Sequence, residues 1–316
     1  MEKQKIIFYL DWTDCIAHLT GDDSYTEGET EEEKAKYARN QQTRFFAALK
    51  NLQQKYDVEI HCITGGTIEY LNGLNGGGWV DQLKELFINE VGPGVFKSVV
   101  TEYGCDMLVL NEKETKIIER PFEDSKVLCT ERLINSINTV IPEEVKDKVE
   151  VTLCNYYGNI RFLDENMTDE QFEYYYAIIG DFNGHENYTL YPYYFPGYGV
   201  EIDVLPNGID KGRGVDSINE YFYSKIPKEQ IALSVFNGDF PEGIDLLMID
   251  HSLTNDVIYV ASEYAEKYET ELNKTSLPHS IGEVKIASIS RLMENLVNMD
   301  LTQHPYDKGD YRYATK

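Results

Sequence analysis

The sequence predicts an α/β protein with a Rossmann-like parallel-sheet core, into which a smaller α+β domain is inserted. Apolar runs rich in branched and aromatic residues, typical of buried strands, alternate with segments of helical periodicity at both ends of the chain. The middle of the chain differs in composition, because tyrosines and phenylalanines cluster there. We therefore expect residues 1–110 and 199–316 to form the core domain, and residues 111–198 to form the inserted domain.

The first half of the core is expected to begin with a buried strand, Ile6-Ile7-Phe8-Tyr9-Leu10, that ends at Asp11. Residues 34–56 predict a helix, because apolar side chains fall near one face: Ala38, Phe45, Ala48, Leu49 and Leu52. A second strand over residues 57–63 ends in Thr64-Gly65-Gly66. The short helix that follows a Gly-rich loop carries the apolar residues Val80, Leu83, Leu86 and Phe87. Strands separated by helices in this way predict parallel βαβ units.

Within the inserted domain, residues 149–163 and 188–194 predict strands, and residues 168–179 predict a helix. The aromatic residues gather in runs such as Tyr174-Tyr175-Tyr176 and Tyr191-Pro192-Tyr193. Such a surface can hold a sugar or another polar ring, but aromatic residues in a mixed domain are more often part of the core. Both interpretations stay open at this point.

The alternation of strands and helices returns after Gly199. Residues 200–206 and 231–236 predict strands, and the second of these runs into Asn237-Gly238-Asp239. A helix is expected near residues 214–223. The core is completed by a short helix and a last strand, at residues 246–249 and 257–261. The strands on both sides of the insertion are therefore of one type.

The composition narrows the possible functions. The chain of 316 residues has a formal net charge of -26, which argues against nucleic acid or an anionic membrane as a partner. Its five cysteines are odd in number and not closely paired, as expected in a reducing cytoplasm. The apolar run before Asp11 is too short for a signal peptide or a membrane span. We expect a cytoplasmic protein, and the sequence carries no signal for an oligomeric state.

A chemically useful group stands at or just after the end of four predicted strands. Asp11 is a candidate carboxylate nucleophile, and Thr64 offers a hydroxyl and backbone amides to a phosphate oxygen. Lys211 is a fixed positive charge, and Asp239 is a second carboxylate suited to a hard cation. Each of these residues, taken alone, can equally be explained as a helix-cap or turn residue. Together they form the set that phosphoryl transfer requires: a nucleophile, a metal site and donors to the phosphate oxygens.

The same motifs, in this order, resemble the haloacid dehalogenase superfamily of phosphohydrolases, specifically its Cof-like sugar-phosphatase branch with a large α/β cap. The segments that carry the resemblance are Leu10-Asp11-Trp12-Thr13, Ile63-Thr64-Gly65, Glu102-Tyr103-Gly104-Cys105, Asp210-Lys211-Gly212 and Gly238-Asp239-Phe240-Pro241-Glu242-Gly243. They span nearly the whole chain, and the insertion falls where that branch carries its cap.

The resemblance implies a Mg²⁺-dependent phosphatase that hydrolyses a small phosphorylated, sugar-phosphate-like metabolite through an aspartyl phosphate on Asp11. It implies that Thr64, Gly65 and Lys211 bind the phosphate. The implied catalytic residues are Asp11, Thr13, Thr64 and Lys211, and the implied Mg²⁺ ligands are Asp11, Thr13, Asp239 and Glu242.

The first and fourth motifs are degenerate. Thr13 stands where the family has the acid/base Asp, and its hydroxyl cannot exchange a proton usefully near neutral pH. Asp14 is a possible substitute. In the fourth motif Glu242 replaces Asn and Gly243 replaces the second Asp, which normally orients the lysine. We expect Lys211 to be oriented by Asp239 instead, with Asp245 as the less favoured partner.

Two function classes follow. The first is a Mg²⁺-dependent phosphohydrolase, slow because Thr13 replaces the acid/base residue. The alternative is a catalytically weak or inactive relative that binds a phosphorylated ligand or a protein partner. Retention of Asp11 favours the enzyme, since a pure binding protein needs no nucleophile. An unrelated nucleotide-binding α/β protein is the weakest reading, because neither a Gly-x-Gly-x-x-Gly nor a Gly-Lys-Ser/Thr loop occurs.

Overall fold

Within the residues that the structure describes, the chain forms two separate sheets, one of seven strands and one of four. The structure is a computed structural model, and it describes residues 3–13, 15–20, 30–72, 78–112, 114–119, 139, 141, 143–163, 168, 170–171, 174, 188–195, 199–238, 244–245, 247–254, 257–261 and 289–298. The chain divides into two compact units, Met1–Ile118 with Lys211–Lys316, and Glu119–Asp210. Each unit holds one sheet.

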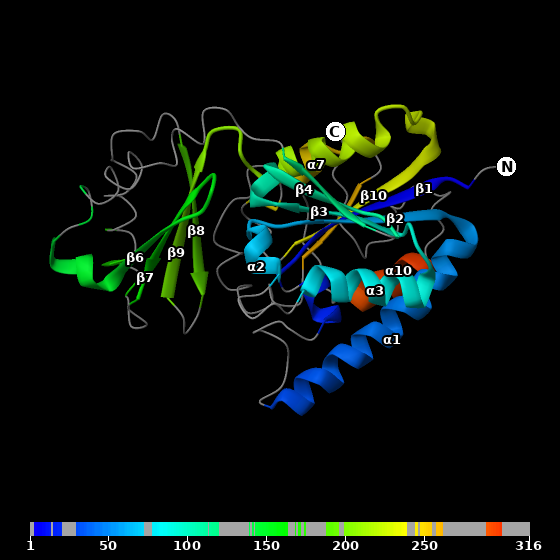
Figure 1. Cartoon of the computed structure of the whole chain (residues 1–316), viewed down its shortest axis with the longest axis horizontal. Helices are drawn as coiled ribbons and strands as arrows, with labels where there is room; N and C mark the ends of the chain where they lie inside the picture. The colour runs from blue at the N-terminus through cyan, green and yellow to red at the C-terminus, as the bar shows by residue number, and fades with distance from the viewer. Residues whose placement is uncertain are drawn as a thin grey trace. The chain divides into compact units, whose positions relative to one another are not determined.

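The larger sheet has the strand order β11-β10-β1-β2-β3-β4-β5 (Figure 1). Five neighbouring strands from β11 to β3 run parallel, and β4 runs antiparallel to β3. Its strands are β1 (Lys5–Asp11), β2 (Asp57–Ile63), β3 (Phe96–Thr101), β4 (Asp106–Leu110), β5 (Thr115–Glu119), β10 (Ile231–Gly238) and β11 (Val257–Ala261). The expected α/β fold with a parallel central sheet is confirmed. The strands β4 and β5, the last two at one side of the sheet, were not expected.

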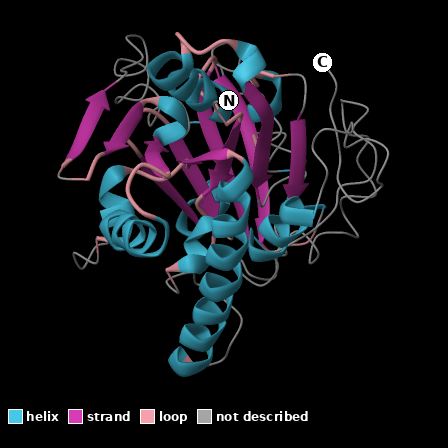
Figure 2. Ribbon diagram, turned by 90° about the vertical axis from the view of Figure 1, so that its right-hand side faces the viewer, coloured by secondary structure: helices cyan, strands magenta, loops and turns pink. Residues whose placement is uncertain are grey.

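Helices pack on both faces of this sheet (Figures 1 and 2). One face is covered by α1 (Glu31–Lys55), α3 (Trp79–Val91) and α10 (Ile289–Asn298), and the other by α7 (Lys211–Ile218) and α8 (Leu247–Asp250). In β1, Ile6, Phe8 and Leu10 face the first set, while Ile7 and Tyr9 face the second. Because both faces are covered, β1 is a nearly continuous apolar run, which is why the sequence predicts it well.

Two helices on the first face show how local sequence determines their ends and packing. Helix α1 begins at a capping box, in which the Thr30 side chain accepts a hydrogen bond from the Glu33 amide and Glu33 reaches back to the Thr30 amide. Its predicted start at residue 34 was three residues late. Helix α10, which the sequence analysis did not find, packs on α1 through a two-bonded Arg44–Glu294 ion pair with N–O distances of 2.8 and 2.6 Å.

Short helical segments connect these elements. They are η1 (Ile16–Leu19), α2 (Ile68–Asn72), η2 (Glu102–Gly104), η3 (Glu143–Lys148), the π-helical turn η5 (Asn219–Tyr223) and η6 (Lys228–Gln230). The π-helical turn continues directly from α7, so the helix expected at residues 214–223 begins three residues earlier and ends in a wider turn. In the part of the chain that the structure describes, no helix is long and apolar enough to cross a membrane.

The second unit contains the four-stranded antiparallel sheet, in the order β6-β7-β9-β8. Its strands are β6 (Val149–Leu153), β7 (Gly158–Phe162), β8 (Tyr188–Phe195) and β9 (Gly199–Pro206). The single strand expected over residues 149–163 is wrong: a turn closed by a 3.0 Å hydrogen bond from Cys154 N to Tyr157 O divides it into a hairpin. The helix expected at residues 168–179 lies largely outside the described residues.

The strand expected at residues 200–206 exists, but its assignment to the core sheet is wrong. It pairs along its full length with β8, from Tyr188–Pro206 to Phe195–Gly199, and also with β7. Residues 202–206 of β9 are all buried, and Glu201 is partly exposed. The change from one unit to the other therefore falls between Asp210 and Lys211.

Candidate functional site

The candidate site lies at the carboxyl edge of β1 and β2, where ligands bind in open α/β sheets. Asp11 is the last residue of β1, and its register partner in β2 is Ile63, the residue before Thr64. The parallel register therefore brings Asp11 and Thr64 to the same edge, as expected from the sequence. Both side chains are buried, with 3% of each residue exposed.

Lys211 joins Asp11 at this edge. Its Nζ donates to Oδ1 of Asp11 at 2.8 Å, and the backbone amide of Trp12 donates to the same oxygen at 2.8 Å. Lys211 is the first residue of α7 and is itself buried. Because both contacts fall on Oδ1, Oδ2 of Asp11 is the atom that can meet a cation or a phosphorus atom.

A second partner of Lys211 among the described residues is Asp245, which the sequence offered as the less favoured partner. Nζ of Lys211 forms a buried ion pair with Oδ1 of Asp245, whose exposed fraction is 0%. The Asp245 carboxylate reaches this position because it packs against the Cα atom of Gly238 at the end of β10. A methyl group at Gly238 would lie 2.4 Å from Oδ2 of Asp245. Asp239 itself lies outside the described residues.

Thr64 begins the loop that follows β2. Its Oγ1 accepts a hydrogen bond from the amide of Gly66 at 3.0 Å, which leaves the proton of the hydroxyl to be donated to an anion. Gly65 is constrained by a neighbour: a methyl group there would lie 2.4 Å from Cζ and from Oη of Tyr103. The loop is therefore held closely, and a larger residue at position 65 would require the Tyr103 ring to move.

The remaining predicted site residues are placed only in part. Thr13 is described and half-buried, two residues after Asp11. Asp14, Asp239, Glu242 and Gly243 lie outside the described residues. In the part of the chain that the structure covers, no three His, Cys, Asp or Glu side chains gather as a metal site. The available donors, Oδ2 of Asp11 and the carbonyl oxygen of Thr13, are hard oxygen ligands of the kind that Mg²⁺ prefers.

A thiol next to the site does not compete with Asp11. Cys62 lies opposite Leu10 in the register of β1 and β2, one residue before the Asp11–Ile63 pair. Burial raises the pKa of the Cys62 thiol well above its ordinary value, the Asp11 carboxylate raises it further, and Lys211 offsets part of the rise. Cys62 therefore stays a neutral thiol at physiological pH and is no nucleophile.

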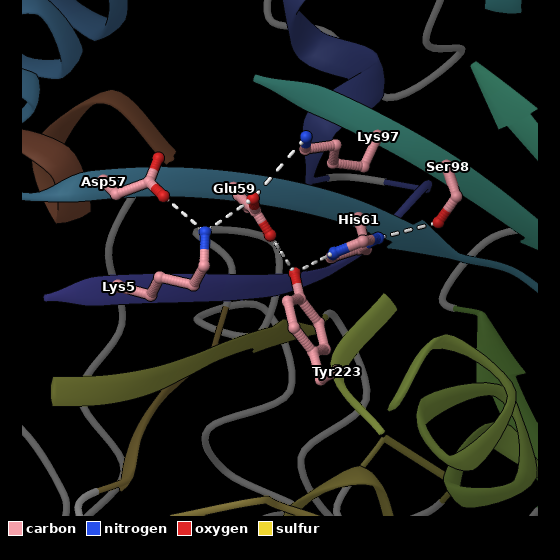
Figure 3. A network of polar contacts seen from close by, with 7 residues as sticks. All are labelled: Lys5, Asp57, Glu59, His61, Lys97, Ser98 and Tyr223. Atoms are coloured by element: carbon pink, nitrogen blue, oxygen red, sulfur yellow. Dashed lines mark hydrogen bonds and ion pairs between the residues drawn. The ribbon is translucent and has the colours of Figure 1, made fainter. Parts of the chain in front are cut away.

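A second buried polar cluster, centred on the middle of β2, was not found from the sequence (Figure 3). The Tyr223 hydroxyl donates to Oε2 of Glu59 at 2.6 Å. The oxygen of Tyr223 then accepts from Nε2 of His61 at 2.6 Å, and Nδ1 of His61 accepts from the Ser98 hydroxyl at 2.7 Å. The Nζ atoms of Lys5 and Lys97 lie 2.9 and 3.5 Å from Oε1 of Glu59, so two cations balance its charge.

The electrostatics of this cluster make it structural. Burial lowers the pKa of His61 well below its ordinary value of 6.5, and Lys97 lowers it further, so the ring is neutral. Burial tends to raise the pKa of Glu59, but the hydrogen bond from Tyr223 and the charges of Lys97 and Lys5 outweigh it and lower that pKa. The cluster fixes the π-helical turn after α7 to the sheet. Polar residues at positions 57, 59 and 61 of an apolar strand were the available sequence signal.

Comparison with solved structures gives distant likenesses. The C-terminal domain of trehalose-6-phosphate phosphatase from C. albicans matches with a TM-score of 0.52 and 12% identity, over 94% of this chain and 92% of that one. An IMP-bound, N-terminally truncated IMP-nucleotidase from Plasmodium falciparum matches with a TM-score of 0.50 and 12% identity, over 81% of this chain and 64% of that one. No protein-family model and no curated protein sequence matches the chain. At these identities the likeness shows a shared α/β fold and nothing of the activity.

Proposed function

We propose that this chain is a Mg²⁺-dependent phosphohydrolase that acts on a small phosphorylated, sugar-phosphate-like metabolite through an aspartyl phosphate on Asp11. The observation that carries the proposal is the setting of Asp11. It lies at the carboxyl edge of the parallel sheet, beside Thr64, with one carboxylate oxygen fixed by Lys211 and Trp12. The known activities of the two structurally similar proteins, a phosphatase and a nucleotidase by name, are consistent with it.

In the proposed reaction, the Thr64 hydroxyl, the Gly65 amide and the Lys211 ammonium bind the phosphoryl oxygens. Oδ2 of Asp11 attacks phosphorus as the bond to the ester oxygen breaks. Water then cleaves the aspartyl phosphate, which releases inorganic phosphate and restores the carboxylate. We assign the Mg²⁺ site to Asp11, the carbonyl of Thr13, Asp239 and Glu242; the bound ion would neutralise charge on the phosphoryl group.

Thr13 sets the expected rate. The first step needs a proton for the leaving oxygen, and the second needs a base for water, and Thr13 supplies neither. Substrates with good leaving groups should therefore react first, and the aspartyl phosphate should accumulate. We further propose that the second unit, Glu119–Asp210, acts as a cap that contacts the non-phosphate part of the substrate.

The absence of an acid/base carboxylate at Thr13 also favours the second candidate function, a protein that binds a phosphorylated ligand and turns it over weakly or not at all. One experiment separates the two. An aryl phosphate and a panel of phosphorylated metabolites are incubated with the protein and Mg²⁺, and phosphate release and phosphorylation of Asp11 are measured. Asp250→Asn, an exposed change on α8, serves as the control for Asp11→Asn. Turnover that is lost only in Asp11→Asn supports the enzyme; saturable binding without turnover supports the binding protein.

A further inference from the structure

The turn η2, Glu102–Gly104, has an unusual backbone. Its three residues have φ angles of 47°, 54° and 98° in succession. Among the described residues, Glu102 and Tyr103 are the two non-glycine residues with positive φ, a conformation that L side chains seldom adopt. Both are also buried, with 1% and 5% exposed. Such strain persists only where the surrounding contacts impose it, and it is concentrated at functional sites.

One set of contacts joins this turn to the loop after β2. The amide of Glu102 donates to the carbonyl of Gly66 at 3.1 Å, and the amide of Tyr103 donates to the carbonyl of Thr64 at 3.2 Å. The ring of Tyr103 lies directly against the Cα atom of Gly65. The turn therefore contacts all three residues of the loop that begins at Thr64.

A second set of contacts joins the same turn to the first turn of α7. A methyl group at Gly104 would lie 2.7 Å from the amide nitrogen of Gly214 and 2.9 Å from the carbonyl carbon of Arg213. Gly214, in turn, fits closely against the side chain of Ile63, at the end of β2. Gly214 comes three residues after Lys211. The backbone of the turn thus contacts the helical turn that presents Lys211.

We infer that the turn Glu102–Gly104 positions Lys211 relative to the Thr64–Gly66 loop, and so sets the spacing of the two groups that receive the phosphate. The effect on phosphate binding rests on the proposed function, whereas the relative position of Lys211 and the loop does not. In this left-handed conformation the turn brings the amides of Glu102 and Tyr103 to the loop and the backbone of Gly104 to α7. Tyr103 is accordingly a positioning residue, acting through the loop.

The first test compares two glycines of similar conformation. Gly104→Ala adds a methyl group against α7, at φ 98°. Gly92→Ala adds one at φ 87°, where nothing lies within 4 Å, so it carries similar strain without the contact. The rate at which acetic anhydride labels Lys211 is measured by mass spectrometry, with Lys5 as the internal reference. We expect labelling of Lys211 to rise about tenfold in Gly104→Ala and to stay at the wild-type rate in Gly92→Ala.

The second test is a steric exchange at the loop. Gly65→Ala places its methyl group in the ring of Tyr103 and should weaken the affinity for inorganic phosphate about tenfold. Tyr103→Gly removes the ring and suits the positive φ, so the double variant should regain affinity relative to Gly65→Ala. Calorimetric titration with inorganic phosphate, together with the split between KM and kcat for an aryl phosphate, provides the readout.

The results separate the inference from the proposed function. Equal labelling of Lys211 in Gly104→Ala and Gly92→Ala, or in the wild type and Gly104→Ala, overturns the inference. A selective rise in labelling supports the positioning role even if the wild type neither binds nor hydrolyses phosphate compounds, and that second result removes the proposed function alone. The inference is also contradicted if a folded Gly65→Ala/Tyr103→Gly double variant binds inorganic phosphate no more tightly than Gly65→Ala does.

Discussion

The ammonium group of Lys211 lies between two buried carboxylates, 2.8 Å from Oδ1 of Asp11 and in direct contact with Oδ1 of Asp245. Asp11 ends β1, and Asp245 follows β10, its neighbour in the sheet. The shared cation offsets the repulsion between these two buried carboxylates. This arrangement fixes the lysine from two sides, so its position does not depend on the bound substrate.

Removing this cation should be costly. Lys211→Met keeps much of the side-chain volume but leaves Asp11 and Asp245 buried without their partner, and we expect a loss of about 3–5 kcal/mol in the free energy of unfolding. Lys50→Met is the control, because the Lys50–Glu90 pair at 2.8 Å is half-exposed and should be worth less than about 1 kcal/mol. Urea denaturation measures both. Equal losses in the two variants would contradict the central role of Lys211.

The contact between Gly238 and Asp245 predicts a strong coupling between these residues. Gly238→Ala places a methyl group 2.4 Å from Oδ2 of Asp245, so the carboxylate must move away from Lys211. We expect destabilisation of about 1–3 kcal/mol. In a double-mutant cycle with Asp245→Gly, the cost of the added methyl group should largely vanish, because the three side-chain atoms it meets, Oδ2, Cγ and Cβ, are gone. Additive losses would mean that the methyl group is accommodated some other way.

The sequence predicted the parallel strands and the ends of β1 and β2, because apolar residues that end in a polar one are a local signal, clearest in the five apolar residues before Asp11. It placed Asp245 second to Asp239 because nothing local distinguishes them. The contact of Asp245 with Lys211 depends on the backbone of Gly238, against which the Asp245 carboxylate packs. Helix α10 was missed for a similar reason, since its ten residues become a stable helix only by packing on α1.

The cluster around His61 predicts a pH dependence of stability. The folded protein holds this ring neutral because burial lowers its pKa well below 6.5. Below pH 6.5 the unfolded chain therefore binds a proton that the folded chain does not, so stability should fall as the pH falls, by up to about 1.4 kcal/mol per pH unit. The slope is measured by urea denaturation between pH 5 and 7, roughly above the range in which Glu59 titrates.

His61→Gln should remove that part of the slope, although it will also lower the stability at every pH. His251→Gln, which changes a partly exposed ring paired with Asp216, should retain it. Glu59 contributes to stability over a different pH range, because its pKa is lowered in the folded protein. Its contribution is complete above the unfolded pKa of 4.5 and is lost as the pH falls through the lower folded pKa. A wild-type slope that survives in His61→Gln would contradict the assignment.

The proposed Mg²⁺ site predicts that Asp239 is a direct ligand. Asp239→Ala should reduce the Mg²⁺ affinity at least about tenfold, since even residues that only support a ligand contribute that much. Calorimetric titration with Mg²⁺ measures the affinity, and Asp250→Ala on the exposed side of α8 is the matched control. Chelation of the metal should also stop turnover of an aryl phosphate. The same affinity in the wild type and Asp239→Ala would remove the metal assignment.

Thr13 gives the most specific prediction about the rate. Thr13→Asp supplies the missing base, so the aspartyl phosphate on Asp11 should break down about 10²–10⁴-fold faster than in the wild type. Thr13→Asn has the same size as the aspartate without its basicity, and it should leave the breakdown slow. The added carboxylate carries a like-charge penalty beside Asp11, which Lys211 and Mg²⁺ offset in part.

Rapid-quench kinetics with an aryl phosphate resolve the two steps. In the wild type, phosphorylation of Asp11 should run ahead of phosphate release, so that phosphorylated protein accumulates in an early burst. In Thr13→Asp the burst should shrink, because breakdown no longer limits turnover, while Thr13→Asn should keep it. If Thr13→Asn accelerates breakdown as much as Thr13→Asp, the gain is not base catalysis. If no phosphorylated protein forms and no substrate turns over in the wild type, Thr13 marks a protein that binds phosphorylated ligands and does not hydrolyse them.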